Sequence, residues 1–430
     1  MPASKLSPGG PGYRRMTLAL FSSGVATFAL LFSTQALLPA ISADLGVAPG
    51  SASWTVSGTT LALALAVLPL SAVSERIGRR RLMTAALAVA VALAVVMPLA
   101  PNHTTLIALR VLQGIAIAGI PASAIAYIGE EVRRESVITA IGLFVAGNSI
   151  GGMTGRILTG WVTQAAGWRV ALAAVAALSL LCAVAFRLLL PAARNFTPSP
   201  LRPRALAATV RTHLADGLML RLYAIGMLFM VVFGAVYTVI GYRLDEAPFN
   251  LSQGLIGSVF VIYLVGTASS SAAGHLAGRF GRRGTIYLGA LTAVVGLLLS
   301  LADSLLAVLL GLVLITAGFF AGHAVASGSV SRTATTGRAQ ASALYQVAYY
   351  AGSSAGATVG ALAFHAAGWG GVVTLGLAAL AGVGAITLYG TSRARAKVRA
   401  PIQARPAFED ERRRRDIRAQ RGTDARASVS

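Results

Sequence analysis

Long apolar segments separated by short charged connections recur along almost the whole chain. A helix needs roughly 20 predominantly apolar residues to cross a bilayer, and each of these segments is about that long. The twelve segments cover residues 17–41, 52–74, 82–100, 104–128, 136–161, 168–190, 219–242, 252–276, 285–302, 305–330, 339–364 and 369–391. The sequence therefore predicts an all-α membrane protein with twelve transmembrane helices.

The composition excludes several other classes of protein. Of the 430 residues, 56% are hydrophobic and only 12% are charged, whereas about a quarter of the residues of a soluble domain are charged. The single cysteine, Cys182, has no partner for an intrachain disulfide. The sequence contains no metal-ligand cluster, phosphate-binding loop or catalytic constellation, so we expect neither an enzyme nor a metal or cofactor.

The basic residues follow a topological pattern. The net charge is +22 at pH 7, and 32 of the 36 Lys and Arg residues lie in alternate connections or in the C-terminal tail. This is the positive-inside pattern, which indicates orientation in the membrane rather than nucleic-acid binding. We expect a multi-pass protein of the inner (plasma) membrane with both termini in the cytoplasm. The exceptions are Arg110, Arg156, Arg169 and Arg243.

A connection rich in Pro and Arg divides the chain into two halves. Its composition resists a packed core and suits a linker along the membrane surface. The predicted parts are a cytoplasmic tail at 1–16, a six-helix bundle at 17–190, the linker at 191–218, a second six-helix bundle at 219–391 and a basic cytoplasmic tail at 392–430.

Three pairs of matching segments indicate that the halves are repeats. The pairs are 76–81 with 279–284 at an offset of 203, the Gly-rich stretches 147–155 with 352–360 at 205, and the Ala-Ala-Gly-Trp segments that end at Trp168 and Trp369 at 201. Two six-helix repeats are an architecture of secondary transporters.

The loop after the second apolar segment resembles the signature of the major facilitator superfamily, with a small residue, an acid, Arg-x-Gly and a basic cluster. The matching residues are Ser71, Glu75, Arg76, Gly78, Arg79 and Arg80, and the second-half copy holds Gly274, Arg279, Gly281 and Arg282 without the acid. The resemblance implies two six-helix bundles that alternate access to a cavity between them. It also implies a cytoplasmic latch at this loop that helps to hold the outward-open state.

Two further motifs support the resemblance. Arg110-Val-Leu-Gln-Gly114 is similar to an Arg-x-x-Gln-Gly motif of the superfamily. An arginine within a span costs about 2.5–3.5 kcal/mol, so Arg110 is expected to face the bundle interior or a wet cavity, with snorkelling to the membrane boundary as the alternative. The run 147–152 is similar to an antiporter-type motif, with Asn148 where that motif has Pro.

The glycines at 147, 151 and 155 share one helix face and predict close approach of another backbone. Arg156 follows them, and it either pairs with a substrate anion or anchors the outer end of the helix. With segments 165–170 and 318–323, this run resembles the acriflavine-sensitivity branch of the superfamily, which is associated with drug efflux.

The resemblance places the substrate cavity between the halves, where polar and aromatic residues are the candidate ligands. For each residue taken alone, packing against a neighbouring helix is the alternative. The candidates are Phe28, Phe32, Gln35, Arg110, Gln113, Asn148, Tyr237, Tyr263, His323, Tyr345, Gln346 and Tyr349.

No predicted span has a carboxylate near its centre. A proton-coupled cycle would therefore use His323, whose unperturbed pKa is about 6.5, or Asp245 and Glu246 at the outer end of a span. The predicted function is proton-coupled efflux of drug-like or hydrophobic compounds. The alternatives are a facilitator or symporter for a small polar solute and a transport-inactive membrane sensor. The expected partners are a small-molecule substrate, protons and lipid, and we expect a monomer.

Overall fold

The computed structural model describes residues 5–198 and 203–427, with side chains described except at 138, 203 and 391–427. The parts of the predicted tails and linker at 1–4, 199–202 and 428–430 lie outside the described residues. Within the described ranges the chain is helical, apart from connections and one isolated bridge between Leu6 and Val132. It divides into two compact units, Met1–Val383 and Gly384–Ser430.

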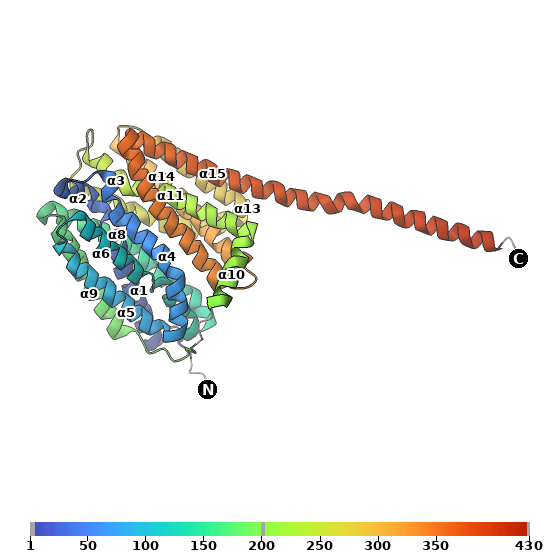
Figure 1. Cartoon of the computed structure of the whole chain (residues 1–430), viewed down its shortest axis with the longest axis horizontal. Helices are drawn as coiled ribbons and strands as arrows, with labels where there is room; N and C mark the ends of the chain where they lie inside the picture. The colour runs from blue at the N-terminus through green and yellow to red at the C-terminus, as the bar shows by residue number, and fades with distance from the viewer. Residues whose placement is uncertain (1–4, 199–202, 428–430) are drawn as a thin grey trace. The chain divides into compact units, whose positions relative to one another are not determined.

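The N-terminal bundle occupies the first part of the larger unit (Figure 1). Its helices are α1 (Pro11–Leu31), η1 (Gln35–Leu37), α2 (Leu38–Leu45), α3 (Pro49–Ala52), α4 (Trp54–Ile77), α5 (Arg79–Val96), η2 (Met97–Leu99), α6 (His103–Ile117), α7 (Pro121–Glu131), η3 (Arg134–Ser136), α8 (Val137–Ala166) and α9 (Trp168–Leu189). Pro11 and Pro121 stand in the first turn of α1 and α7, where a missing N–H costs no helical hydrogen bond. Asn102 caps α6 by accepting a hydrogen bond from the Thr105 amide (2.9 Å).

The second set of helices begins within the predicted linker. It comprises α10 (Pro203–Ala215), α11 (Gly217–Asp245), α12 (Gln253–Ser258), η4 (Val259–Ile262), α13 (Tyr263–Leu299), α14 (Leu305–Thr333) and α15 (Arg338–Ala427). Asp216 caps α11 by accepting from the Leu218 amide (2.7 Å). The helix α10 lies against the connection between α14 and α15, where His213 hydrogen bonds the Gly337 carbonyl (3.2 Å).

In the described part of the chain, ten helical stretches are long and apolar enough to cross a membrane. Two of these stretches each contain two of the twelve predicted segments, which explains the smaller number. The stretches Gln253–Leu299 and Arg338–Gly390 hold 47 and 53 residues, about twice what one crossing needs. Each contains a sharp break, at Gly281 (φ 72°, ψ 164°) and at Ala367–Gly368, and α15 changes direction at its break (Figure 1). The predicted fold of twelve crossing segments is thereby confirmed.

Glycine faces bring α8 close to α1 and the first part of α15 close to α11. A Cβ on Gly155 would lie 2.8 Å from the Ala29 Cα atom, and one on Gly360 would lie 2.6 Å from the Ala235 Cα atom. Gly147 and Gly151 meet the α1 backbone in the same way, as Gly352 and Gly356 meet α11. The prediction of close backbone approach is confirmed, and both halves use the same device.

The connections of the larger unit gather at two faces. One face, called here the basic face, carries the N-terminal start of α1, the α4–α5 turn, the α7–α8 connection and the α14–α15 connection. There the Lys5 ammonium donates to the Gly129 carbonyl (3.3 Å), and Arg79 pairs with Glu130. The opposite face carries the α2–α3 and α8–α9 connections, where Trp168 donates to Asp44 (3.0 Å).

Candidate functional site

The two bundles touch at the opposite face through two glycines. A Cβ on Gly160 of α8 would lie 2.8 Å from the Cα atom of Gly257 in α12. Beside this contact, the indole of Trp161 donates to the hydroxyl of Ser258 (3.0 Å). Backbones approach this closely only where neither residue carries a side chain. The contact closes the space between α8 and α12.

A second closure joins α2 of the first bundle to α11 of the second. The Tyr242 hydroxyl donates to the Leu38 carbonyl (3.0 Å) and lies 2.6 Å from the Ser42 hydroxyl. Further towards the centre, Gln35 Nε2 donates to the Thr238 hydroxyl (3.4 Å). The opposite face is thus held together by polar contacts as well as by backbone packing.

A cavity of about 230 Å³ lies between the bundles. It is called the central cavity below. Its surface is largely aromatic, with one guanidinium and one imidazole among the lining groups. The lining residues are Phe28, Phe32, Val145, Asn148, Ser149, Gly152 and Arg156 from the first bundle, and Met230, Phe233, Tyr263, Phe320, His323, Gln346, Tyr349 and Tyr350 from the second.

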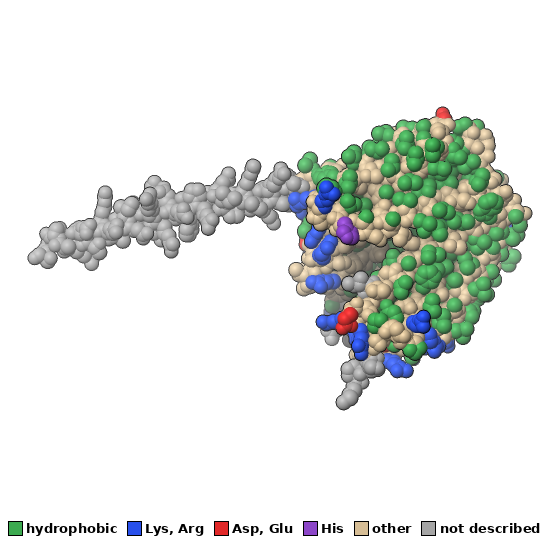
Figure 2. Space-filling view, turned by 180° about the vertical axis from the view of Figure 1, so that it is seen from behind, with side chains coloured by type: hydrophobic (Ala, Val, Ile, Leu, Met, Phe, Trp, Pro, Cys, Tyr) green, Lys and Arg blue, Asp and Glu red, His purple; other side chains and the backbone are tan. Residues whose placement is uncertain are grey.

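A larger cavity of about 650 Å³, the basic-face vestibule, separates the bundles on the other side. His323, Gln346 and Tyr350 line both cavities, so the central cavity continues into the vestibule. Figure 2 shows a hollow in the surface whose rim carries Lys and Arg side chains. The bundles therefore meet at the opposite face and part towards the basic face.

The structure brings seven of the twelve candidate ligands together around the central cavity. They are Phe28, Phe32, Asn148, Tyr263, His323, Gln346 and Tyr349. Tyr345 lines the vestibule instead. Gln35 lies behind the cavity wall against Arg156, and Tyr237 is fully buried with its hydroxyl 2.6 Å from that of Thr316.

Arg156 lines the central cavity, and the sequence analysis gave two alternative roles for it. Its side chain is 1% exposed, Nε donates to Gln35 Oε1 (2.8 Å), and Nη1 donates to the Gly152 carbonyl (2.6 Å). Its guanidinium lies over the rings of Phe32 (4.3 Å) and Tyr263 (4.7 Å). It is therefore held in the cavity wall, and the signal in the sequence was an arginine within a span.

His323 projects from α14 into an aromatic cluster. Its Nδ1 atom is hydrogen bonded to the Tyr345 hydroxyl (2.8 Å), and its ring stacks on Phe319 with centroids 5.7 Å apart. The Tyr349 ring lies 4.7 Å away, centroid to centroid. Because a neutral imidazole and a hydroxyl can exchange donor and acceptor roles, a proton gained on Nδ1 would reverse this hydrogen bond.

Arg110 and Gln113 lie outside the lining of both cavities, in the core of the first bundle. The α1 helix ends at Leu31, and Arg110 donates to the carbonyls of Leu30 (2.7 Å) and Leu31 (2.5 Å) in its last turn. It also donates to the Thr55 carbonyl (2.8 Å) and to Gln113 Oε1 (2.7 Å). This motif joins α1, α4 and α6, so its role in the structure is to hold the broken first span.

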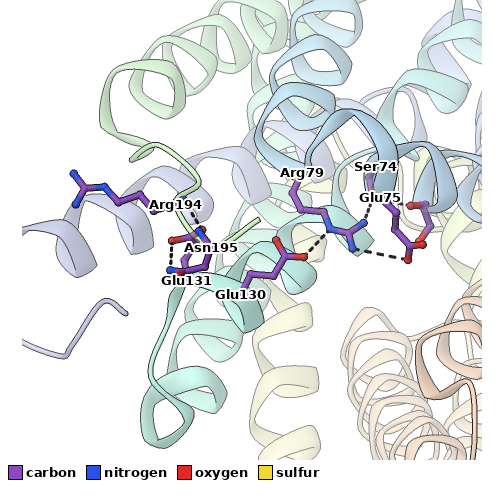
Figure 3. A network of polar contacts seen from close by, with 8 residues as sticks. Ser74, Glu75, Arg79, Glu130, Glu131, Arg194 and Asn195 are labelled. Carbon is purple, nitrogen blue, oxygen red and sulfur yellow. Dashed lines mark hydrogen bonds and ion pairs between the residues drawn. The ribbon is translucent and has the colours of Figure 1, made fainter. Parts of the chain in front are cut away.

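The signature loop forms a polar network at the basic face (Figure 3). Arg79 bonds the Ser74 hydroxyl, pairs with Glu130 (Nε to Oε1, 3.1 Å) and approaches Glu75 (3.8 Å). The side chain of Glu75 is 42% exposed, and Ser71, Glu75 and Arg79 all line the vestibule.

These contacts stay within the first bundle, so the network holds the α4–α5 turn to α7 in this state. Glu130 was absent from the predicted set, although its position at the end of the fourth apolar segment placed it on the same face. Gly78 has a φ of 100° and supplies the turn that the motif predicts. Arg76 is exposed, and Arg80 is half-buried.

The residues of the second copy of the motif are more exposed than those of the first. Gly281 has a φ of 72°, while Arg279 and Arg282 are exposed and Gly274 has open space where a Cβ would stand. Asp245 and Glu246 lie exposed at the opposite face, far from the vestibule, where Asp245 accepts from Gln253 (3.2 Å). Among the described residues, no group of three or more His, Cys, Asp or Glu could hold a metal ion.

Two helical bundles with matching glycine faces and a cavity between them, closed at one face and open at the other, are the architecture of a membrane transporter. Comparison of the sequence with known protein families leads to the same class. The model of the Major Facilitator Superfamily matches residues 18–247 and 222–422, and the chain belongs to this family.

The relatives support the same assignment. An uncharacterized MFS-type transporter of Bacillus subtilis (YybF) is 36% identical over 85% of this chain and 90% of its own. The inner membrane transport protein YnfM of Escherichia coli is 38% identical over 86% of this chain and 89% of its own. A crystal structure of a bacterial homologue of the lysosomal transporter Spinster has a TM-score of 0.70 at 15% identity, covering 89% of this chain and 96% of that one, which shows the shared fold.

Proposed function

We propose that this membrane transporter exports small, amphipathic, drug-like compounds across the inner membrane in exchange for protons. The observation that carries the proposal is the central cavity, which is closed at the opposite face and continuous with the basic-face vestibule. The positive-inside rule places the basic face and both termini in the cytoplasm. The structure is then inward-facing, and its aromatic cavity accepts an apolar ring from the cytoplasm. The resemblance to the acriflavine-sensitivity branch supports the export direction.

We assign proton coupling to His323. It lies in the cavity wall with its Nδ1 atom bonded to Tyr345, and a proton there would add a charge to the surface that receives the substrate. A protonated ring repels a cationic compound and a neutral ring admits it. Asp245 and Glu246 are the second choice because both are exposed at the opposite face.

Transport in inside-out membrane vesicles tests the proposal. Labelled cationic, neutral and anionic aromatic compounds are offered to vesicles with an acidified lumen. At least one should accumulate, and a protonophore should abolish the accumulation. His323→Gln should lose this accumulation but keep downhill exchange, whereas His275→Gln, at an exposed site on α13, should behave as the wild type.

Other outcomes of these transport experiments would contradict specific parts of the proposal. Loss of coupling in Asp245→Asn with Glu246→Gln, but not in His323→Gln, would move the coupling group to the opposite face. Transport that ignores both the gradient and the protonophore would identify a facilitator. A chain that moves none of the compounds in either direction would be a sensor.

One observation favours a second candidate function, proton-coupled uptake of an anionic solute. Arg156 places a positive charge in the cavity wall, and no described carboxylate pairs with it. A substrate anion and a proton on His323 would then strengthen each other's binding, because opposite charges in a poorly solvated cavity attract. Accumulation in right-side-out vesicles with an acidic exterior, and none in inverted vesicles, would select this candidate.

A further inference from the structure

We propose that Arg156 is an anion-binding residue of the central cavity and that the substrates are small aromatic or other amphipathic carboxylates. The inference rests on the proposed function, because it takes the central cavity as the place where the substrate binds. A carboxylate substrate favours the second candidate, in which the anion and the proton bind together.

The first argument is the unused hydrogen-bonding capacity of Arg156. A guanidinium has five N–H donors, and two of them are occupied by Gln35 and by the Gly152 carbonyl. Among the described residues Nη2 has no hydrogen-bond partner, although the side chain is 1% exposed. Arg110, in contrast, donates hydrogen bonds to protein oxygens from all three of its guanidinium nitrogens. The hydrogen bonding of Arg156 is therefore incomplete by comparison.

The second argument is the charge balance. The four ion pairs among the described residues involve Arg79, Arg169 and Arg243, and none involves Arg156. A buried charge without a counter-ion is costly, and the rings over it compensate only part of that cost. A carboxylate in the cavity would supply the missing charge and could accept two parallel hydrogen bonds from the planar guanidinium.

The third argument is the shape and chemistry around the charge. The rings of Phe32, Phe260 and Tyr263 lie 4.3 to 4.9 Å from the guanidinium carbon. Tyr263 lines the cavity, and its buried hydroxyl is a polar group without a hydrogen-bond partner among the described residues. A carboxylate next to an apolar ring matches this combination, because the acid reaches the donors while the ring packs on aromatic surface.

A binding experiment on the purified full-length protein tests the inference without requiring transport. Thermal unfolding in detergent is measured with benzoate, salicylate, phenylacetate and 1-naphthoate, and with benzamide and benzylamine as neutral and cationic counterparts. We expect at least one carboxylate to raise the midpoint in a saturable way, with its amide and amine counterparts much weaker.

Substitutions then assign the effect to one residue. Arg156→Gln should weaken carboxylate binding at least about tenfold, and Arg156→Lys should retain part of the preference for the anion. Arg169→Gln is the control, because Arg169 lies at the opposite face and pairs with Asp44 (2.5 Å). The Lys variant keeps the test valid should the Gln variant fold poorly.

The outcomes separate this inference from the proposed function. Unchanged carboxylate affinity in Arg156→Gln, a preference for benzylamine, or no stabilisation by any carboxylate would overturn the inference. Transport of cationic compounds without carboxylate binding would leave the proposed function standing alone. If carboxylate binding requires Arg156 but the protein transports nothing, the inference about the binding site would stand and the transport proposal would be refuted.

Discussion

Gly160 of α8 and Gly257 of α12 lie backbone to backbone across the two bundles, with a Cβ on either glycine less than 3.0 Å from the other's Cα atom. Alternating access requires that this contact forms when the basic face opens and separates when it closes. A side chain at this point should therefore act on the conformational equilibrium rather than on substrate chemistry.

Gly160→Leu should shift the protein towards the state that is open at the opposite face. The readout is the labelling of Ser149→Cys, a cavity-lining position, by an impermeant maleimide in a Cys182→Ser background. Labelling from the basic-face side should fall and labelling from the opposite side should rise several-fold. Gly142→Leu is the control, because the same helix has open space at Gly142, and an equal effect of both variants would refute the contact as a gate.

Arg110→Ala should destabilise the first bundle by about 3 kcal/mol or more, because it removes the buried hydrogen bonds of the guanidinium to the Leu30, Leu31 and Thr55 carbonyls. Arg110→Lys should recover little, since one ammonium cannot reach carbonyls on two helices in fork geometry. Thermal unfolding in detergent is the measurement. A wild-type midpoint with lost transport would instead return Arg110 to a role in the transport cycle.

Much of the fold was predictable because a membrane helix can be recognised in the sequence by its length and apolarity. The charged connections show where each helix ends. The glycine faces of α8 and α15 were also predictable, since glycine spacing on a helix reports close packing directly. The breaks within spans were not predicted. The end of α1 at Leu31 depends on Arg110, which lies about 80 positions later in the chain.

The candidate site was predicted in part for a related reason. Phe28, Phe32 and Asn148 were assigned through the resemblance to a known fold, which says which helices face the cavity. A periodic pattern cannot say which face of a fully apolar helix meets water, so Arg110 and Gln113 were placed in the cavity although they bind backbone in the bundle core. The sequence left Arg156 between pairing with a substrate anion and anchoring the helix. The proposal of anion binding depends on the absence of an ion pair to Arg156 among the described residues, which only the three-dimensional structure reveals.

Glu75→Gln should increase the inward-facing population. In this state Glu75 is partly exposed in the vestibule and is paired loosely with Arg79 (3.8 Å). Glu75 therefore adds little to the stability of this state and should add more to the stability of the state in which the basic face is closed. Labelling of Ser149→Cys from the basic-face side should rise. Glu135→Gln, an exposed acid of η3 on the same face, is the control, and identical labelling in both variants would argue against a latch.

Gly151→Leu and Gly356→Leu should have similar, strongly destabilising effects, because each residue faces the backbone of the partner helix in its own half, at Val25 and Val231. Since the backbone cannot move aside as a flexible side chain can, overpacking here should cost at least about 1–3 kcal/mol. Yield and unfolding midpoint in detergent are the measurements. If one variant is tolerated and the other is not, the two halves do not share this packing device.

Distance measurements between spin labels test alternating access most directly. One pair is placed across the basic face, at Glu135 and Thr336, and another across the opposite face, at Ala165 and Ala302; all four positions are exposed, and Cys182→Ser removes the native thiol. In lipid nanodiscs, changes of pH, addition of a bound carboxylate and the Gly160→Leu substitution should change the two distances in opposite directions. Distances at both faces that stay the same under all three changes, or that increase together, would contradict the account.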